Sequence, residues 1–328
     1  MKNEKKQILV IRLSSLGDIL LTTPVLRALK DKYPGCEITY LCREEYLNAL
    51  KTNSNISSFL TLRVEQNEEE IHNKIVSSDF DLIIDLQNNF RSRNILKSVN
   101  VPVYKFRKPN IKKFLLVNLK LNLYKKYLSI PELYAKSVPG LVLDDEGVDL
   151  LIPDNIKPSL KPDDKYIGFI PGSKHYSKRW PLEYFIQLGK LLNKYGYTIV
   201  IFGGKDDKEI CSAVSAQITK SKNLCNDNDL YAASADMRMC SLIVSNDSGL
   251  MHAASSSYVP MIVLFGSSVE HFGFAPYKRE SVILQNETLK CRPCSHYGKE
   301  ECPKKHFKCM LDLTPNLVFE KIKKALAL

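Results

Sequence analysis

The residues best suited to chemistry lie in one short segment, SNDSGLMHAAS, at residues 245–255. Its turn, Asn246-Asp247-Ser248-Gly249, offers a side chain for capping, backbone N–H groups without helical partners, and a glycine that lets a ligand approach the backbone. Such a turn at the start of a helix binds anions. A purely structural role is equally compatible with these residues, in which Asp247 caps the helix and His252 packs.

A second polar segment, SSLGD at residues 14–18, follows the apolar run QILVIRL. It lacks the GxGxxG pattern of a classical dinucleotide site. Asp18 is its only group able to accept a proton at neutral pH, because Ser14 and Ser15 cannot do so. A carboxylate could serve as a general base here, although a Gly-Asp pair is more often a turn.

Basic and acidic side chains follow two apolar runs of the second half. Lys174, His175, Lys178 and Arg179 follow YIGFI, where cations could neutralise a diphosphate or could be ordinary surface residues. The run YTIVIFGG is followed by adjacent aspartates, Asp206 and Asp207, and a carboxylate at this point could bind ribose hydroxyls. We expect Asp206 to be the one that does so.

Alternating strands and helices are predicted to position these residues. Seven short apolar runs are typical of buried strands. They are QILVIRL, EITYLC and FDLIIDL in the first half of the chain, and YIGFI, YTIVIFGG, LIVS and MIVLF in the second. Helical spacing separates several of them, for instance after Thr23-Pro24, where proline suits a first helical position. This repetition predicts parallel sheets. The proline-rich, charged segment 153–164 is the best linker and divides the chain into two domains.

Composition excludes several classes of protein. The 328 residues are 44% hydrophobic, enough for a large core and for two domains of ordinary size. The basic amino terminus has too short an apolar run for a signal peptide, and no apolar stretch approaches the length of a membrane span. Nine dispersed cysteines, an odd number, suit a reducing cytosol better than a disulfide framework.

The net charge of +11 is confined to one region. Between Asp85 and Glu132 there is no acidic residue, and eleven basic residues account for the whole excess, since the rest of the chain has 47 − 11 = 36 basic and 36 acidic residues. These are Arg91, Arg93, Lys97, Lys105, Arg107, Lys108, Lys112, Lys113, Lys120, Lys125 and Lys126. One basic face for an anionic partner, or a solvated helix surface, would explain this pattern.

Within this region, residues 110–128, NIKKFLLVNLKLNLYKKYL, mix lysines with apolar residues and predict a helix with one basic and one apolar side. Such a helix could lie on an anionic membrane surface, face a phosphorylated glycolipid, or pack on a core with a solvated outer face.

Four motifs of the chain resemble one known family. SNDSGLMHAAS followed by PMIVLFG resembles the donor-site signature of the ADP-heptose:lipopolysaccharide heptosyltransferases, glycosyltransferase family 9, whose usual form Asp-Thr/Ser-Gly-x-x-His is matched by Asp247, Ser248, Gly249 and His252. ILVIRLSSLGDILLTTPVLRALK resembles its amino-terminal motif, SKRWP its lysine-bearing segment, and the cysteine-bearing tail that of heptosyltransferase II-type members. The resemblance covers nearly the whole chain and is weakest at residues 99–162.

The resemblance implies an α/β protein of GT-B fold, with two Rossmann-like domains whose parallel sheets face a central cleft. Residues 1–155 would form an amino-terminal acceptor-binding domain, and residues 165–311 a carboxyl-terminal domain that binds the nucleotide-sugar donor. Residues 312–328 would form a helix that returns to the first domain.

The implied activity is inverting transfer of heptose from ADP-heptose to the inner core of lipopolysaccharide. Asp18 would be the catalytic base, and Lys178 would be a second catalytic residue acting on the leaving diphosphate. The implied donor-binding residues are Ser173, Arg179, Asp206, Asp247, Ser248, Gly249 and His252, and the expected acceptor-binding residues are Ser14, Ser15, Gly17, Lys112 and Lys113.

No metal or redox cofactor is implied, only a nucleotide-sugar co-substrate, ADP-heptose. The expected partners are this donor and a lipid-linked anionic glycan, with no nucleic acid. The expected location is cytoplasmic, with peripheral contact at the inner face of the inner membrane. Four alternatives stay open: a GT-B-like nucleotide-sugar epimerase, a transferase of another sugar to a different cell-surface glycan, a non-catalytic sugar-binding protein, and a nucleic-acid-binding protein.

The tail contains four cysteines, Cys291, Cys294, Cys302 and Cys309, of which only the first pair has the spacing of a zinc finger. We therefore expect structural thiols, and purified protein should contain no stoichiometric zinc. Elemental analysis checks this, and one zinc per chain would contradict it.

Overall fold

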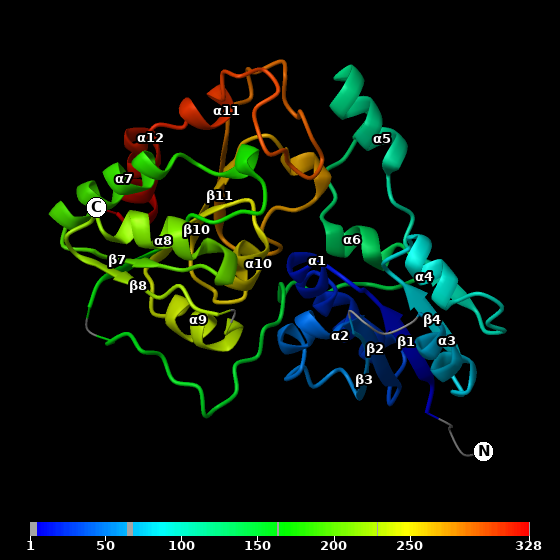
Figure 1. Ribbon diagram of the computed structural model, residues 1–328. Helices are drawn as coiled ribbons and strands as arrows, with labels where there is room; N and C mark the ends of the chain where they lie inside the picture. The colour runs from blue at the N-terminus through cyan, green and yellow to red at the C-terminus, as the bar shows by residue number, and fades with distance from the viewer. Residues whose placement is uncertain (1–4, 64–67, 163, 228, 328) are drawn as a thin grey trace. The chain divides into compact units, whose positions relative to one another are not determined.

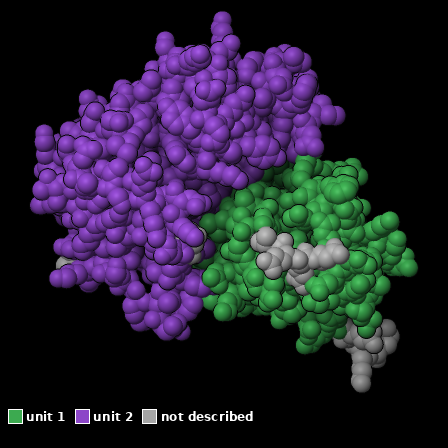
Figure 2. Space-filling model, viewed as in Figure 1, with its two compact units in different colours: residues 1–108, 129–151 green, residues 109–128, 152–328 purple. Residues whose placement is uncertain are grey.

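The computed structural model describes residues 5–63, 68–162, 164–227 and 229–327. The chain forms two compact units (Figure 2). Unit 1 comprises residues 1–108 and 129–151, and unit 2 comprises residues 109–128 and 152–328. The chain therefore leaves unit 1 at residue 108, returns to it at residue 129, and leaves it again after residue 151.

Unit 1 is built on a five-stranded parallel sheet in the order β3-β2-β1-β4-β5 (Figure 1). The strands are β1 (Gln7–Ile11), β2 (Glu37–Arg43), β3 (Ser58–Leu62), β4 (Leu82–Asp85) and β5 (Val103–Lys105). Its helices and helical turns are α1 (Leu16–Leu20), α2 (Thr23–Lys32), η1 (Glu44–Ala49), α3 (Glu68–Val76), α4 (Phe90–Ile95) and α6 (Ile130–Ala135). The strand order reverses between β1 and β4, which is where open parallel sheets bind ligands.

Unit 2 is built on a six-stranded parallel sheet in the order β11-β10-β9-β6-β7-β8. The strands are β6 (Tyr166–Ile170), β7 (Thr198–Ile201), β8 (Ser221–Asn223), β9 (Leu242–Asn246), β10 (Met261–Phe265) and β11 (Ser281–Gln285). Its longer helices are α7 (Leu182–Lys194), α8 (Lys208–Ser215), α9 (Leu230–Met237), α10 (Gly249–Ser255) and α12 (Pro315–Leu326). Shorter pieces are η3 (Tyr176–Lys178), η4 (Lys205–Asp207), η5 (Glu270–Phe272) and α11 (Lys308–Leu311).

Both sheets confirm the prediction of an α/β fold with two parallel sheets. Every residue of β4, β6, β9 and β10 is buried, as expected for central strands covered on both faces by helices. The order of unit 2 reverses between β6 and β9, so the loops that follow these two strands meet at the carboxyl edge of the sheet.

The helix expected at residues 110–128 is much shorter than predicted. It consists of α5 (Asn110–Phe114) and a single π-helical turn, η2 (Leu115–Leu119), and it ends where Lys120 adopts a left-handed backbone with φ 58°. The Nζ of Lys120 then donates a hydrogen bond of 2.7 Å to the Pro293 carbonyl of the tail. This tertiary contact outweighs the helical pattern, in which asparagines 118 and 122 are weak helix formers.

The final helix, α12, packs on α7 within unit 2. Val318 and Ile322 are fully buried in the same core as the α7 side chains. Ahead of the helix, the indole N–H of Trp180 donates a hydrogen bond of 2.7 Å to the Leu313 carbonyl. The periodicity of α12 predicted an apolar side but could not specify the surface that covers it.

Within residues 5–63, 68–162, 164–227 and 229–327, no helix is both long and apolar enough to cross a membrane.

If α12 is part of the core of unit 2, Ile322→Ala should lower the free energy of unfolding by about 2–5 kcal/mol, because it removes fully buried methyl groups. Leu317→Ala, on the same helix but 38% exposed, is the matched control and should cost less than about 1 kcal/mol. Urea unfolding measures both, and equal losses would show that α12 is not packed as described.

Candidate functional site

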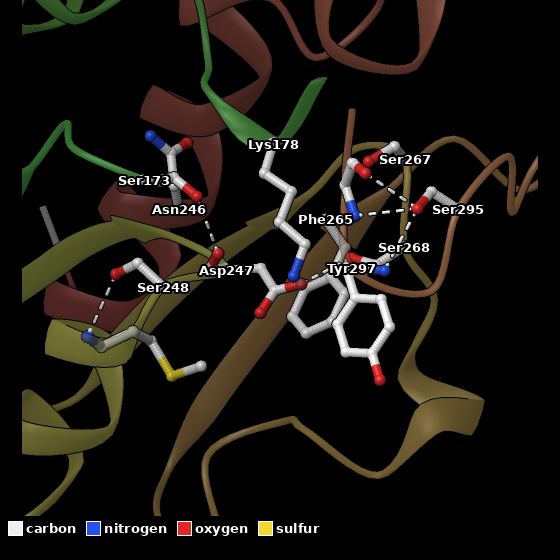
Figure 3. A network of polar contacts seen from close by, with 12 residues as sticks. Ser173, Lys178, Asn246, Asp247, Ser248, Phe265, Ser267, Ser268, Ser295 and Tyr297 are labelled. Carbon is white, nitrogen blue, oxygen red and sulfur yellow. Dashed lines mark hydrogen bonds and ion pairs between the residues drawn. The ribbon is translucent and has the colours of Figure 1, made fainter. Parts of the chain in front are cut away.

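The most strongly built polar site of unit 2 is centred on Asp247, the residue directly after β9 (Figure 3). Its carboxylate is buried and forms an ion pair with Lys178, with 2.7 Å between Nζ and Oδ2. The Ser268 hydroxyl donates a hydrogen bond of 2.5 Å to the same oxygen. Burial opposes ionisation of Asp247, but the charge and hydrogen bond of Lys178, with the Ser268 hydroxyl, outweigh it and lower the pKa of this carboxyl group.

Lys178 ends the helical turn η3 in the loop after β6, and its side chain is only 14% exposed. The turn is held by a hydrogen bond of 3.0 Å from the Lys178 N–H to the His175 carbonyl. Beside it, the Ser177 and Ser267 hydroxyls lie 2.9 Å apart, which joins the loops after β6 and β10. These contacts fix the lysine in the direction of Asp247.

Asn246 positions the Lys178 loop, a role that was not predicted although the residue was named as part of the turn. Its side chain is fully buried at the end of β9, where Oδ1 accepts a hydrogen bond of 3.0 Å from the Trp180 N–H. Its Nδ2 donates one of 2.8 Å to the Pro171 carbonyl. The amide therefore ties β9 to both ends of the loop that carries Lys178. An amide at the last position of a buried strand was the signal available in the sequence.

Other predicted donor residues adjoin this pair. Ser173 is buried and donates a hydrogen bond of 3.2 Å to the Asp247 carbonyl, while its own carbonyl accepts one of 2.6 Å from Arg179 Nε. Ser248 caps α10 by accepting from the Met251 N–H at 3.3 Å, and Gly249 is the first helical residue. His252 is buried in α10 with its ring 6.3 Å from that of Phe274. The packing role weighed for His252 is therefore present, but the cap of α10 is Ser248 and not Asp247.

The two adjacent aspartates of η4 differ in environment. Asp206 is exposed. Asp207 accepts a hydrogen bond of 3.1 Å from the Gly204 N–H, and its carboxylate lies so close to Gly172 that a Cβ there would be 2.1 Å from Oδ1. Burial raises the pKa of Asp207. The structure therefore places Asp207, and not the expected Asp206, against the loop that follows β6.

In unit 1, Asp18 belongs to the first turn of α1 and not to a loop. Its Oδ2 accepts a hydrogen bond of 2.9 Å from the Ser15 hydroxyl. Its Oδ1 lies 2.8 Å from Nη2 of Arg12, and the Tyr134 hydroxyl donates to it at 3.4 Å. The Asp18 side chain is 17% exposed, so it is held on several sides but remains accessible.

Arg12 and Tyr134 were not predicted. Arg12 is buried and donates hydrogen bonds of 2.8 Å to the carbonyls of Ser14 and Leu86. Burial raises the pKa of Tyr134 well above its usual value, so this phenol stays a hydrogen-bond donor. An arginine that continues a buried strand requires an anionic partner, and this was the available signal for Arg12.

The predicted acceptor residues are distributed over both units. Ser14, Ser15 and Gly17 adjoin Asp18 in unit 1, where Gly17 is buried. Lys112 and Lys113 lie on α5, which is assigned to unit 2. Lys112 is exposed, with its Nζ 5.8 Å from the ring centre of Tyr124.

The cysteines of the tail are all free thiols. Cys291 Sγ lies 3.7 Å from His306 Nε2, and Cys302 Sγ accepts a hydrogen bond of 3.4 Å from the Phe307 N–H. Over the described parts of the chain, no three His, Cys, Asp or Glu side chains are grouped as a metal site would require.

Comparison with known proteins supports the resemblance drawn from the motifs. The sequence profile of "Glycosyltransferase family 9 (heptosyltransferase)" matches residues 70–305, well over half of the chain. The chain belongs to this family. The match includes the Lys178 loop and the Asp247 turn, so the two partners of the buried ion pair of this family 9 chain both fall inside it.

Individual relatives agree in family and in fold. A lipooligosaccharide heptosyltransferase 2 of Campylobacter jejuni is 34% identical over 171 residues, which covers 50% of this chain and only 52% of that protein. The Haemophilus influenzae protein of the same name is 24% identical over 98% of this chain and 99% of its own. The solved structure of E. coli ADP-heptose lps heptosyltransferase II superposes with a TM-score of 0.75 at 23% identity, over 98% of each chain, which confirms the GT-B fold.

The ion pair predicts a specific stability effect. Lys178→Met leaves the buried Asp247 carboxylate without its cation and should lower the free energy of unfolding by about 3–5 kcal/mol at neutral pH. Adding Asp247→Asn should recover part of the loss, whereas Lys174→Met, at an exposed lysine of the same loop, should change little. Thermal and urea unfolding of the four proteins measure this.

The pH dependence has a defined sign. The pKa of Asp247 is lowered in the folded protein, so the stability from its ionised form is present above the ordinary carboxyl pKa and is lost as pH falls through the lowered value. The deficit of Lys178→Met should therefore shrink on acidification. A deficit that does not change with pH would separate Lys178 from the charge of Asp247.

Proposed function

We propose that this chain is an inverting glycosyltransferase that transfers heptose from ADP-heptose to the inner core of lipopolysaccharide. The observation that carries the proposal is the buried Lys178–Asp247 pair at the point where the strand order of unit 2 reverses, within a match to the heptosyltransferase family. Full-length relatives named heptosyltransferase 2 support the choice of sugar and acceptor.

The reaction is a direct displacement. An acceptor hydroxyl oxygen forms a bond to the anomeric carbon while the bond from that carbon to the diphosphate oxygen breaks, and ADP leaves with the electron pair. Lys178 stabilises the charge that develops on the diphosphate, because its ammonium has three donors and Asp247 takes only one of them. The N–H groups at Ser248 and Gly249 face the same anion.

Asp18 accepts the proton of the acceptor hydroxyl. Arg12 and Ser15 hold its carboxylate in one orientation. A general base must be ionised, and Nη2 of Arg12, at 2.8 Å from Oδ1 of Asp18, stabilises the carboxylate anion. The geometry supports a base that takes the proton as the new bond forms.

The remaining donor contacts are assigned by position. Five residues around the Asp247 turn are proposed to bind the diphosphate and the sugar. They are Ser173, Arg179, Ser248, Gly249 and His252. For the ribose we propose Asp207 in place of Asp206, because Asp207 faces the loop after β6.

The acceptor is proposed to be a lipid-linked anionic glycan, approached from Ser14, Ser15 and Gly17 and assisted by the basic residues of 91–126. The proposed location is the cytoplasm, with peripheral contact at the inner membrane, and no metal, redox cofactor or nucleic acid takes part.

The deciding experiment incubates the purified chain with a panel of nucleotide sugars and a lipopolysaccharide-core acceptor, with products identified by mass spectrometry. Heptose added to the core from ADP-heptose alone supports the proposal. Transfer of a different sugar would reassign the donor. A new sugar isomer formed without acceptor would point to an epimerase, and donor binding without turnover would point to a sugar-binding protein.

The general base gives the sharpest kinetic prediction. Asp18→Asn keeps the shape of the side chain, removes its basicity, and should lower kcat by roughly 10²- to 10⁴-fold while ADP affinity stays near that of the parent protein. Asp31→Asn, at an exposed carboxylate of α2, is the matched control.

Asp18→Asn also removes the anionic partner of buried Arg12, so thermal unfolding must accompany the kinetics. Wild-type turnover in a folded Asp18→Asn protein would reduce Asp18 to a residue of the α1 turn.

A further inference from the structure

Large apolar side chains are exposed in one short part of the chain. Six of the seventeen exposed large apolar residues of the described structure fall within residues 111–127. They are Ile111 at 77% exposure, Phe114 at 60%, Leu119 at 57%, Leu121 at 53%, Leu123 at 49% and Tyr127 at 42%. We call these six residues the apolar patch. A group of this kind marks a surface with a binding partner.

The charge within the segment that carries the apolar patch is of one sign. Residues 109–128 contain five lysines and no acidic residue, and the nearest acidic residues in sequence are Asp85 and Glu132. Lys112, Lys125 and Lys126 are exposed beside the patch. A partner that covers this surface must therefore be both apolar and anionic.

Two residues of the segment, Lys120 and Tyr124, contact the rest of unit 2. Lys120 donates hydrogen bonds of 2.6 Å and 2.7 Å to the carbonyls of Val117 and Pro293. The Tyr124 ring lies 6.1 Å from that of His271, and burial raises the pKa of Tyr124 to about 12. These contacts join Lys120 to the tail, although the lysine itself stays exposed, and leave Tyr124 half-buried. The neighbouring residues Leu119, Leu121 and Leu123 stay exposed, and the irregular backbone after Lys120 maintains this arrangement.

We propose that residues 110–127 dock on the surface of an anionic phospholipid bilayer, with the apolar patch in the acyl boundary and the exposed lysines at the headgroups. Leucine, phenylalanine and isoleucine gain free energy at the acyl boundary, tyrosine suits the interface, and lysine is attracted to anionic lipid. The inference rests on the proposed function, because a lipid-linked acceptor would lie at such a surface.

The test is sedimentation with vesicles of phosphatidylcholine alone and of phosphatidylcholine mixed with phosphatidylglycerol. The parent protein should bind the mixed vesicles and bind less as salt is raised. Ile111→Ser, Phe114→Ser and Leu121→Ser combined should weaken binding at least about tenfold, because each removes apolar area from the acyl boundary. The matched control combines Val76→Ser, Phe90→Ser and Val142→Ser, which are 56%, 80% and 81% exposed outside the segment, and should bind as the parent does.

A second arm separates the charge from the apolar contribution. Lys112→Gln, Lys125→Gln and Lys126→Gln combined should reduce binding to the mixed vesicles while leaving the weak binding to phosphatidylcholine alone unchanged. Turnover with a delipidated, soluble core acceptor should be the same for the parent and the apolar-patch variant. If no transfer occurs but vesicle binding follows the patch, the proposed function fails and the docking surface stands.

Three results would overturn the docking surface. The first is parent protein that does not bind mixed vesicles, and the second is an apolar-patch variant that binds them as the parent does. The third is a dimer of the parent protein that light scattering detects, that is lost in the apolar-patch variant, and that forms without any vesicle binding, because the patch would then contact a second copy of this chain.

Discussion

The buried ion pair between Lys178 and Asp247 is the constraint on which the rest of unit 2 depends. Taking an ammonium and a carboxylate out of water costs several kcal/mol for each, and their attraction offsets this only when their geometry is fixed. The fixing groups come from three loops: Asn246 ends β9, Ser177 precedes the lysine after β6, and Ser268 follows β10. Because parallel strands end at one edge of the sheet, the fold that creates the pair also places it at the edge where open parallel sheets bind ligands.

Unit 1 uses the same location for a different purpose. Arg12 and Asp18 also meet at the carboxyl edge of a parallel sheet, but the guanidinium bonds to the Ser14 and Leu86 carbonyls as well, so its donors are largely occupied. Arginine holds a planar group in one orientation, whereas an ammonium can rotate its donors toward a new anion. The arginine of unit 1 is therefore suited to orient a carboxylate, and the lysine of unit 2 to receive negative charge.

The parts of the fold predicted correctly from sequence are those set by local pattern. Apolar runs located β1, β6, β9 and β10, and the segment between β9 and β10 had room only for a short helix, which is α10. The turn at Asp247 could be recognised for the same reason. The long helix expected at residues 110–128 failed because of a contact far apart in the chain, Lys120 reaching Pro293. The surface that covers α12 and the place of Asp207 beside Gly172 also depend on distant contacts, so the local pattern could not specify them. Arg12 as the partner of Asp18 could have been suspected from its buried strand position, but not assigned.

The segment that departs most from its predicted structure is also the one whose composition is least balanced. Outside residues 86–131 the basic and acidic side chains cancel, so the excess positive charge that would attract an anionic partner lies within this region. A regular helix would have placed its apolar side against a core and left only lysines exposed. The helix ends at Leu119, Lys120 and Tyr124 contact the rest of unit 2, and both lysines and leucines of the segment stay exposed. The break in the helix therefore turns a basic surface into one that is basic and apolar at once.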